Sequence, residues 1–167
     1  IAGAQMAPAL NKAALKDKDA VEVLVVRQLP RPSQRTVLVG DVVAFNSPLG
    51  PPDASHVMVR RVAAMEGEEM VASAGPEEDS YSIPPGHCWV LADNPDLKPP
   101  HVIDSRSFGH IPLSNIVGRV IYAASSKSDH GPVTNHPVHE DEDGAVIDAE
   151  VDVDELIGDG SDSDREQ

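Results

Sequence analysis

The groups that could carry nucleophilic chemistry in this chain are few. A serine hydroxyl attacks a carbonyl efficiently only when a neighbouring base removes its proton, so an enzyme of this kind needs both groups at one place. Ser47, Ser55 and Ser105 offer hydroxyls for a relocated arrangement, in which Lys12 or a histidine would act as the base. No motif joins any of these hydroxyls to a base. These residues by themselves therefore predict no active site.

Two adjacent arginines, Arg60 and Arg61, lie inside a Val-rich run at residues 57–65 that is predicted to form a strand. A guanidinium presents a planar set of N–H donors that matches a carboxylate or a phosphate. Successive side chains of a strand point to opposite faces, so one of the two should face outward. This pattern favours a solvated or ion-paired role over ligand binding.

Five short blocks follow one another along the chain, and together they carry a family signature. They are Gly3-Ala4-Gln5-Met6-Ala7-Pro8, Gly40-Asp41-Val42-Val43-Ala44-Phe45, Val59-Arg60-Arg61-Val62, Ala92-Asp93-Asn94 and Asp104-Ser105-Arg106-Ser107-Phe108-Gly109. The ordered set resembles the signal peptidase I family over residues 3–122. The last block and the compact size are most similar to the mitochondrial inner-membrane proteases. The resemblance implies a fold of antiparallel sheets and a serine-type leader-peptide peptidase that cleaves after small residues.

The resemblance also implies that the usual chemistry of this family is lost. The family has a nucleophilic serine where this chain has Gln5, and a general-base lysine where it has Arg60. An amide has no hydroxyl to attack with, and an arginine keeps its proton under all relevant conditions. A serine that orients the base lysine is replaced here by Val102, and the connection from 94 to 104 is longer than in the family.

The surrounding frame keeps the residue types of the family. The resemblance assigns to Asp104 and Arg106 a structural ion pair, which a carboxylate and a guanidinium can form in a fork geometry. The other frame residues implied around the former site are Gly3, Met6, Pro8, Gly40, Asp41, Asp93, Asn94 and Gly109. We predict neither a cofactor nor a metal ion.

Short Val-rich runs separated by Pro and Gly predict a mainly β domain. We expect strands at 21–26, 36–45, 57–65, 88–91 and 116–123, with a bulge at Gly118 and a short helix at 9–16. Aromatic residues make up only 3% of the chain, so the core must consist mainly of Val, Ala, Ile and Leu. Cys88 lies in one of the apolar runs, where a buried, inert thiol is expected.

The charge is concentrated at the C-terminal end. Residues 140–167 hold 13 acidic residues and one arginine, so only −3 of the net charge of −15 belongs to the rest of the chain. A nearly neutral body lacks the basic face that nucleic acid requires. We predict a β domain at 1–124 and a disordered acidic tail at 125–167, because the tail offers little apolar surface to bury.

The tail itself contains several weaker patterns. His130, His136 and His139 precede a run of acids, but their spacing matches no closed zinc site, so a solvated segment is favoured over a weak metal site. Residues 148–154 alternate acidic and apolar types, which suits a docking segment. Ser161 and Ser163 have acidic residues three positions later and are candidate phosphorylation sites.

No run of the roughly 18 apolar residues that a membrane span requires occurs in the chain. The chain begins with Ile already inside the first family block, and the resemblance implies a membrane anchor directly upstream of it. We therefore expect membrane attachment through an anchor missing from this sequence. The mitochondrial inner membrane is the favoured location, with a chloroplast membrane as the second choice.

The sequence thus predicts a non-catalytic subunit or scaffold that holds a membrane protein partner or an extended peptide with small side chains. Such a peptide would bind by strand addition. One alternative is an active leader-peptide processing endopeptidase that has a relocated catalytic arrangement or works through a partner subunit. Another is a purely structural subunit, whose groove would be filled or covered.

Overall fold

The computed structural model describes residues 1–49, 56–72 and 79–162. Its main sheet has seven strands, all paired antiparallel, in the order β1-β8-β2-β3-β6-β7, and β9 also pairs with β8. These strands are β1 (Val23–Gln28), β2 (Val42–Asn46), β3 (Val57–Met65), β6 (His87–Leu91), β7 (Ile111–Pro112), β8 (Ile116–Ser126) and β9 (Asp129–Pro132). The predicted mainly β, antiparallel fold is confirmed.

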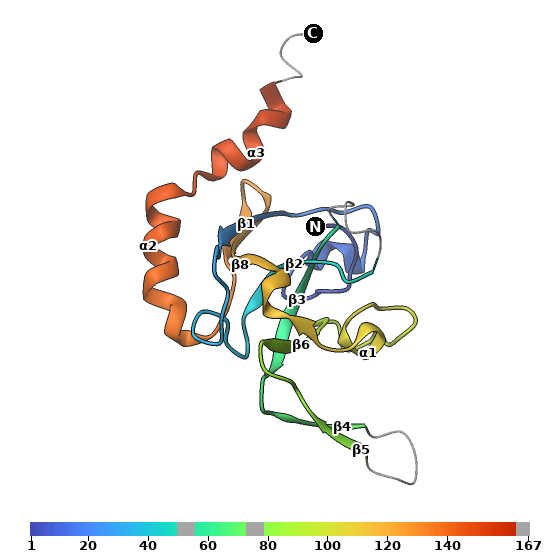
Figure 1. The fold of residues 1–167 in the computed structure, drawn as a ribbon. Coiled ribbons are helices and arrows are strands. Elements are labelled where there is room, and N and C mark those ends of the chain that lie inside the picture. Colours follow the sequence, from blue (N-terminus) through green and yellow to red (C-terminus); the bar gives the residue numbers. More distant parts are fainter. Residues whose placement is uncertain (50–55, 73–78, 163–167) are drawn as a thin grey trace.

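A second, two-stranded sheet of β4 (Glu69–Ala72) and β5 (Asp79–Ser82) extends away from the main sheet (Figure 1). The helical elements are short: η1 (Lys12–Leu15), α1 (Ser105–Phe108), η2 (Leu113–Asn115), η3 (Pro137–His139), α2 (Glu140–Glu150) and α3 (Val153–Asp162). The helix expected at 9–16 is thus reduced to one 3₁₀ turn, and the strand expected from 36 starts only at Val42. No helix within the described ranges is long and apolar enough to cross a membrane.

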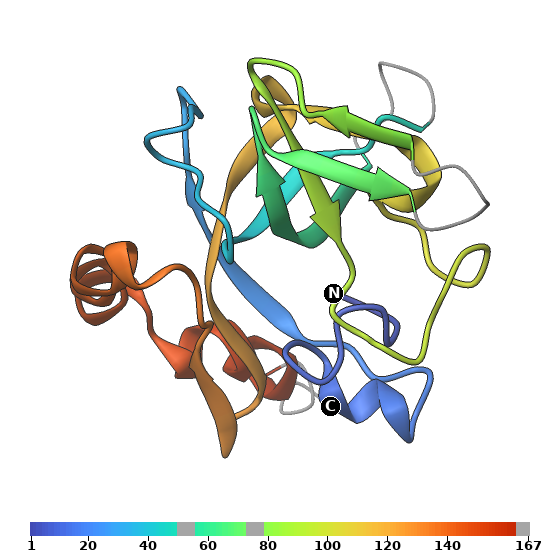
Figure 2. The same cartoon turned by 90° about the horizontal axis from the view of Figure 1, so that it is seen from below.

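The core is aliphatic, as the composition requires. One cluster of buried residues surrounds Phe45 and includes the thiol of Cys88, which is fully buried as expected. A second cluster contains Met6 and Leu10 of the N-terminal segment, packed against β2 and β8. The N-terminal segment is therefore part of the folded body. Figure 2 shows it beside the loop that precedes α1.

Gly118 is required by a close approach between strands, and the bulge lies next to it. A Cβ atom on Gly118 would lie 2.2 Å from the carbonyl oxygen of Arg27 in β1. The register shifts where Val117 has no partner in β2, one residue before the predicted bulge. The glycine therefore serves to bring β1 and β8 together.

The structure corrects the expectation of a disordered tail over residues 125–162. The chain continues through β9 and η3 into α2 and α3, which lie beside β1 and β8 (Figure 1, Figure 2). Asp143 of α2 is buried, and it binds Arg119 of β8 and Arg27 of β1. Composition did not predict this order, because two acidic side chains of α2, Glu142 and Asp143, pair with arginines of the sheet.

Candidate functional site

Gln5 and Arg60, 55 residues apart in the sequence, are in direct contact. The side-chain oxygen Oε1 of Gln5 accepts a hydrogen bond from Nη2 of Arg60. Asn94 holds the turn that carries Gln5: its backbone N–H donates to Gln5 O (3.0 Å), and its Nδ2 donates to Ala4 O (2.8 Å). The fold therefore brings the expected nucleophile position and the expected base position together.

The guanidinium of Arg60 is held by main-chain oxygens. Its Nε donates to Ile103 O at 2.9 Å, and its Nη1 donates to Val59 O at 2.6 Å. Arg60 is only 6% exposed. Burial lowers the pKa of Arg60, and the nearby charge of Asp104 opposes part of this effect. No carboxylate of the described residues lies within 4 Å of the guanidinium, so its charge has no ion-pair partner.

Asp104, the other charged residue near the site, forms an ion pair with Arg106. The carboxylate is fully buried and accepts from Arg106 Nη2 (2.7 Å) and Nε (3.0 Å), the expected fork geometry. It also accepts from the backbone N–H of Ala92 and caps α1 by accepting from the Arg106 N–H. Burial raises the pKa of Asp104, but these hydrogen bonds outweigh burial and leave its pKa below the ordinary value.

Val102 and Gly109 frame the same loop. Val102 is fully buried, and its neighbour in the chain supplies the carbonyl that binds Arg60. Gly109 follows α1 with φ 82°, a backbone conformation that L side chains rarely adopt. The loop before α1 therefore places a buried, apolar Val102 side chain next to the carbonyl that binds Arg60.

Among the described residues, the other candidate hydroxyls form no catalytic pair. Ser105 is 1% exposed, and its Oγ accepts from Val90 N at 2.9 Å. Ser47 bonds the backbone of Leu49, Lys12 is exposed, and Ser55 lies outside the described residues. Over the ranges that the structure covers, no serine hydroxyl shares a hydrogen bond with a lysine or a histidine.

Asp41 joins the strand β2 to the C-terminal segment. The fully buried carboxylate accepts from the backbone N–H groups of Leu38 (2.9 Å) and His136 (3.0 Å), and it contacts Nε2 of His139 at 2.9 Å. Gly40, with φ 98°, makes the turn that precedes Asp41. Asp41 belongs to the frame predicted from the sequence, but its partners His136 and His139 were not predicted, because they lie 95 and 98 residues away.

Arg61 links three parts of the chain. It pairs with Asp93 (2.9 Å) and donates to the carbonyls of Gly40 (2.6 Å) and Thr134 (2.9 Å). The ion-paired role that the sequence favoured is therefore present for Arg61, whereas Arg60 is buried without a counter-ion. Asp93 precedes Asn94, so Arg61 also supports the loop that carries Gln5.

The N-terminal frame residues hold the turn around Gln5. Gly3 has φ 80°, its carbonyl accepts from Asn11 Nδ2 (3.0 Å), and Met6 is fully buried in the core. Pro8 follows a cis peptide bond. Asn11 was missed by the sequence analysis. Asn11 is the residue before η1 and has a φ of 53°, a backbone conformation that the sequence does not reveal.

A groove of about 690 Å³ opens beside Gln5 and Arg60. One wall is the start of β3, at 57–60, which pairs with β2 on one edge. Pairing with β6 begins only at Arg61, so the other edge of 57–60 has no strand partner in the described part of the chain. The opposite wall is the start of β1, an edge strand of the sheet, and Val21, just before β1, forms a bridge with Ala2. Exposed apolar side chains line both walls: Val21, Val23 and Val57.

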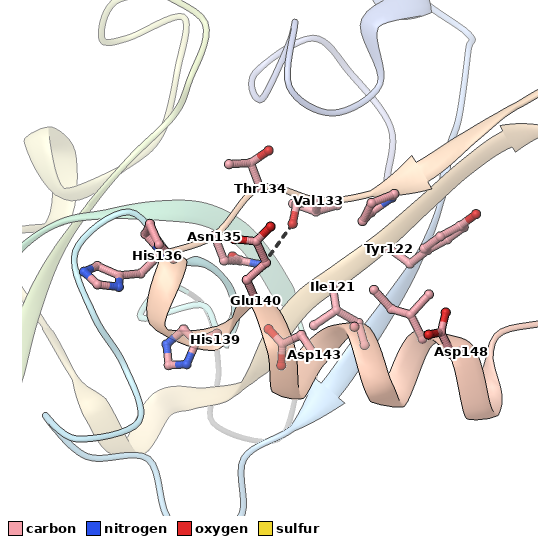
Figure 3. Close-up of a pocket in the computed structure, with 14 residues that line it drawn as sticks. Ile121, Tyr122, Val133, Thr134, Asn135, His136, His139, Glu140, Asp143 and Asp148 are labelled. Atoms are coloured by element: carbon pink, nitrogen blue, oxygen red, sulfur yellow. Dashed lines mark hydrogen bonds between the residues drawn. The ribbon is translucent and has the colours of Figure 1, made fainter.

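A second cavity, of about 580 Å³, lies between β8 and the C-terminal segment (Figure 3). Its wall includes Asn135, which accepts from Val42 N (2.7 Å) and donates to the carbonyls of Val120 and Val133. The three tail histidines are separately engaged: His139 with Asp41, His130 with Tyr122, and His136 with the backbone N–H of Val138. The candidate phosphorylation site Ser161 lies in α3, and Ser163 lies outside the described residues.

Comparisons with known proteins find relatives among the mitochondrial inner membrane protease subunits. The chain is 39% identical over 133 residues to the mitochondrial ATP-independent inner membrane protease subunit 2 of Arabidopsis thaliana, an alignment of 80% of the chain and 63% of the relative. It is 29% identical to the mitochondrial inner membrane protease subunit 1 of Schizosaccharomyces pombe, over 71% of the chain and 67% of the relative. For subunit 1 from Homo sapiens, identity is 32% over 55% of the chain and 52% of the relative. The chain thus spans about half to two thirds of these relatives. No family profile matches it.

Proposed function

Because the chain belongs to the signal peptidase I-like family of the mitochondrial inner membrane protease subunits, we propose that it is a non-catalytic member that binds a peptide or a partner. Its location is the mitochondrial inner membrane. The observation that carries the proposal is the contact of Gln5 with Arg60, the two positions to which the resemblance assigns the family's serine and lysine.

The two side chains at this place cannot perform the family's reaction. The amide of Gln5 has no atom that forms an acyl intermediate, and the guanidinium of Arg60 has no free electron pair for a proton. Their mutual hydrogen bond uses the Gln5 oxygen and one Arg60 N–H. This hydrogen bond thus joins the turn that carries Gln5 to Arg60 of β3.

The groove supports the binding half of the proposal. The edge of 57–60 away from β2 and the outer edge of β1 have no strand partner in the described residues, so an extended peptide would add there as a strand. The Val59 carbonyl already accepts from Arg60, and Val21, just before β1, forms a bridge with Ala2. Exposed Val21, Val23 and Val57 would contact its side chains. In a membrane complex, a segment of a partner subunit could occupy the same groove.

The test is a cleavage assay on the full-length protein, run beside an active member of the family. Peptides with small residues at the cleavage site are incubated with each protein and followed by mass spectrometry. The unmodified protein is expected to leave the peptides intact while the active member cuts them. Cleavage by the unmodified protein would refute the proposal.

A doubly substituted variant, Gln5→Ser with Arg60→Lys, provides the matched comparison. It restores both residue types, and the fold already brings the two positions into contact. We expect at most weak cleavage, because buried Val102 has no hydroxyl to orient the new lysine. Weak activity in this variant alone would assign the loss of chemistry to these two positions.

A further inference from the structure

The guanidinium of Arg60 is a buried cation that lacks a counter-ion. It is 6% exposed, and Asp104, whose negative charge acts on Arg60, already forms a fork with Arg106. A buried charge is costly unless a charge of opposite sign and hydrogen bonds compensate it. The site therefore favours a ligand that brings a negative charge to Arg60.

The hydrogen bonds of Arg60 leave donors for such a ligand. A guanidinium has five N–H groups. Three are used: Nε donates to Ile103 O, one Nη1 hydrogen to Val59 O, and one Nη2 hydrogen to Gln5 Oε1. One N–H remains on each terminal nitrogen. Two such donors on one planar group match the two oxygens of a carboxylate.

The groove brings an extended peptide to these donors. Arg60 is the one basic side chain and Glu22 the one acidic side chain among the described residues that line the groove, and Glu22 accepts a hydrogen bond from the backbone N–H of Asn11. The unpaired edge of β3 at 57–60 ends at Arg60 itself, because Arg61 already pairs with β6. A peptide that adds as a strand along this edge therefore finds no unpaired edge beyond Arg60, where the guanidinium lies.

We propose that Arg60 binds the C-terminal carboxylate of an extended peptide that lies in this groove. This inference rests on the proposed function, because it requires a groove that binds peptide without cutting it. The ligand class is a peptide with a free C-terminus and small or apolar last residues, in keeping with the Val-lined walls. Hydrolysis of a peptide bond leaves such a carboxylate on the N-terminal fragment, so the product of another peptidase would fit.

The test measures the binding of three fluorescent peptides to the full-length protein by anisotropy. The peptides share one sequence that ends in small residues; the first has a free C-terminal carboxylate, the second a C-terminal amide, and the third two further residues. A carboxylate on a buried guanidinium is expected to bind about 10- to 100-fold more tightly than the amide, since charge-assisted hydrogen bonds are the stronger kind.

Two variants and one control assign the effect to Arg60. Arg60→Gln is expected to bind the acid and the amide equally, whereas Arg60→Lys keeps a charge without the fork and should retain a reduced preference. Arg35→Gln removes an exposed arginine outside the groove and should behave as the unmodified protein. Thermal unfolding shows whether each variant is folded. If Arg60→Gln is not folded, the comparison with the unmodified protein uses Arg60→Lys.

The outcomes separate this inference from the proposed function. Equal affinity of the unmodified protein for all three peptides would overturn the role of Arg60 and leave peptide binding standing. Tighter binding of the extended peptide than of the free acid would also overturn it, because the chain would then pass beyond Arg60. Cleavage of the extended peptide would instead refute the proposed function.

Discussion

Replacing Asp143 with Asn tests the docking of the C-terminal segment most directly. The Asp143 carboxylate accepts from Arg119 Nε (2.8 Å) and Nη2 (2.7 Å) and from Arg27 Nη1 (2.9 Å). The side chains of Arg119 and Asp143 are 3% and 8% exposed. Removing the carboxylate leaves the Arg119 cation buried without its partner, a change that typically costs 3–5 kcal/mol. We expect Asp143→Asn to lower the free energy of unfolding by about 3 kcal/mol.

The assay is unfolding by urea and by heat at pH 7, followed by circular dichroism. A loss of about 3 kcal/mol corresponds to a fall in Tm of about 6–12 °C for a chain of this length. Asp141→Asn is the matched control, because Asp141 lies on the same helix α2 and is exposed without a recorded partner. The control should change stability by less than about 0.5 kcal/mol.

The pH dependence of the same variant supplies a second check. Burial raises the pKa of Asp143, but the hydrogen bonds from Arg119 and Arg27 outweigh it, so the folded protein has the lower pKa. The unfolded chain then binds more protons in acid. The contribution of Asp143 is thus complete above the unfolded pKa of about 3.9 and disappears as pH falls through the folded pKa. Equal stability of both variants at pH 7 would refute the argument that the Asp143 ion pairs stabilise the docking of α2 on the sheet.

Two further predictions concern the sheet. Gly118→Ala should destabilise the protein by about 2–4 kcal/mol in urea unfolding, because the new Cβ would lie 2.2 Å from the Arg27 carbonyl oxygen. Gly131→Ala in β9, with nothing within 4 Å, should have little effect, and equal losses would contradict the close-approach argument. Burial raises the pKa of Cys88 to about 12, so at pH 8 a thiol reagent should label it about a thousandfold more slowly than in urea-unfolded protein. Rapid labelling of the folded protein would show that β6 opens or that the thiol is accessible.

The strands were predictable because their signal is local. Runs rich in Val and bounded by Pro or Gly predicted β3, β6 and β8 with nearly the observed bounds. The segment before β2 was misassigned, because a turn over 38–41 is stabilised by the Asp41 carboxylate and not by strand pairing. The family resemblance supplied the site, since five short blocks in a fixed order carry far more information than any one of them.

The chemical capacity of the site is a property of residue type, and the sequence alone determined it. Whatever the fold around them, Gln5 has no hydroxyl and Arg60 does not give up its proton. Only the tertiary structure decided that these two side chains touch, and that Asp104 pairs with Arg106 and leaves Arg60 without a counter-ion.

For the acidic C-terminal segment, too, the sequence determined one part and the tertiary structure another. The sequence established its charge, but composition could not show that Asp143 meets Arg119 and Arg27, or that His139 meets Asp41. These partners lie 24 to 116 residues away in the chain. Whether a carboxylate is solvated or buried in an ion pair depends on what the fold brings within about 3 Å of it, and no local pattern encodes that distance.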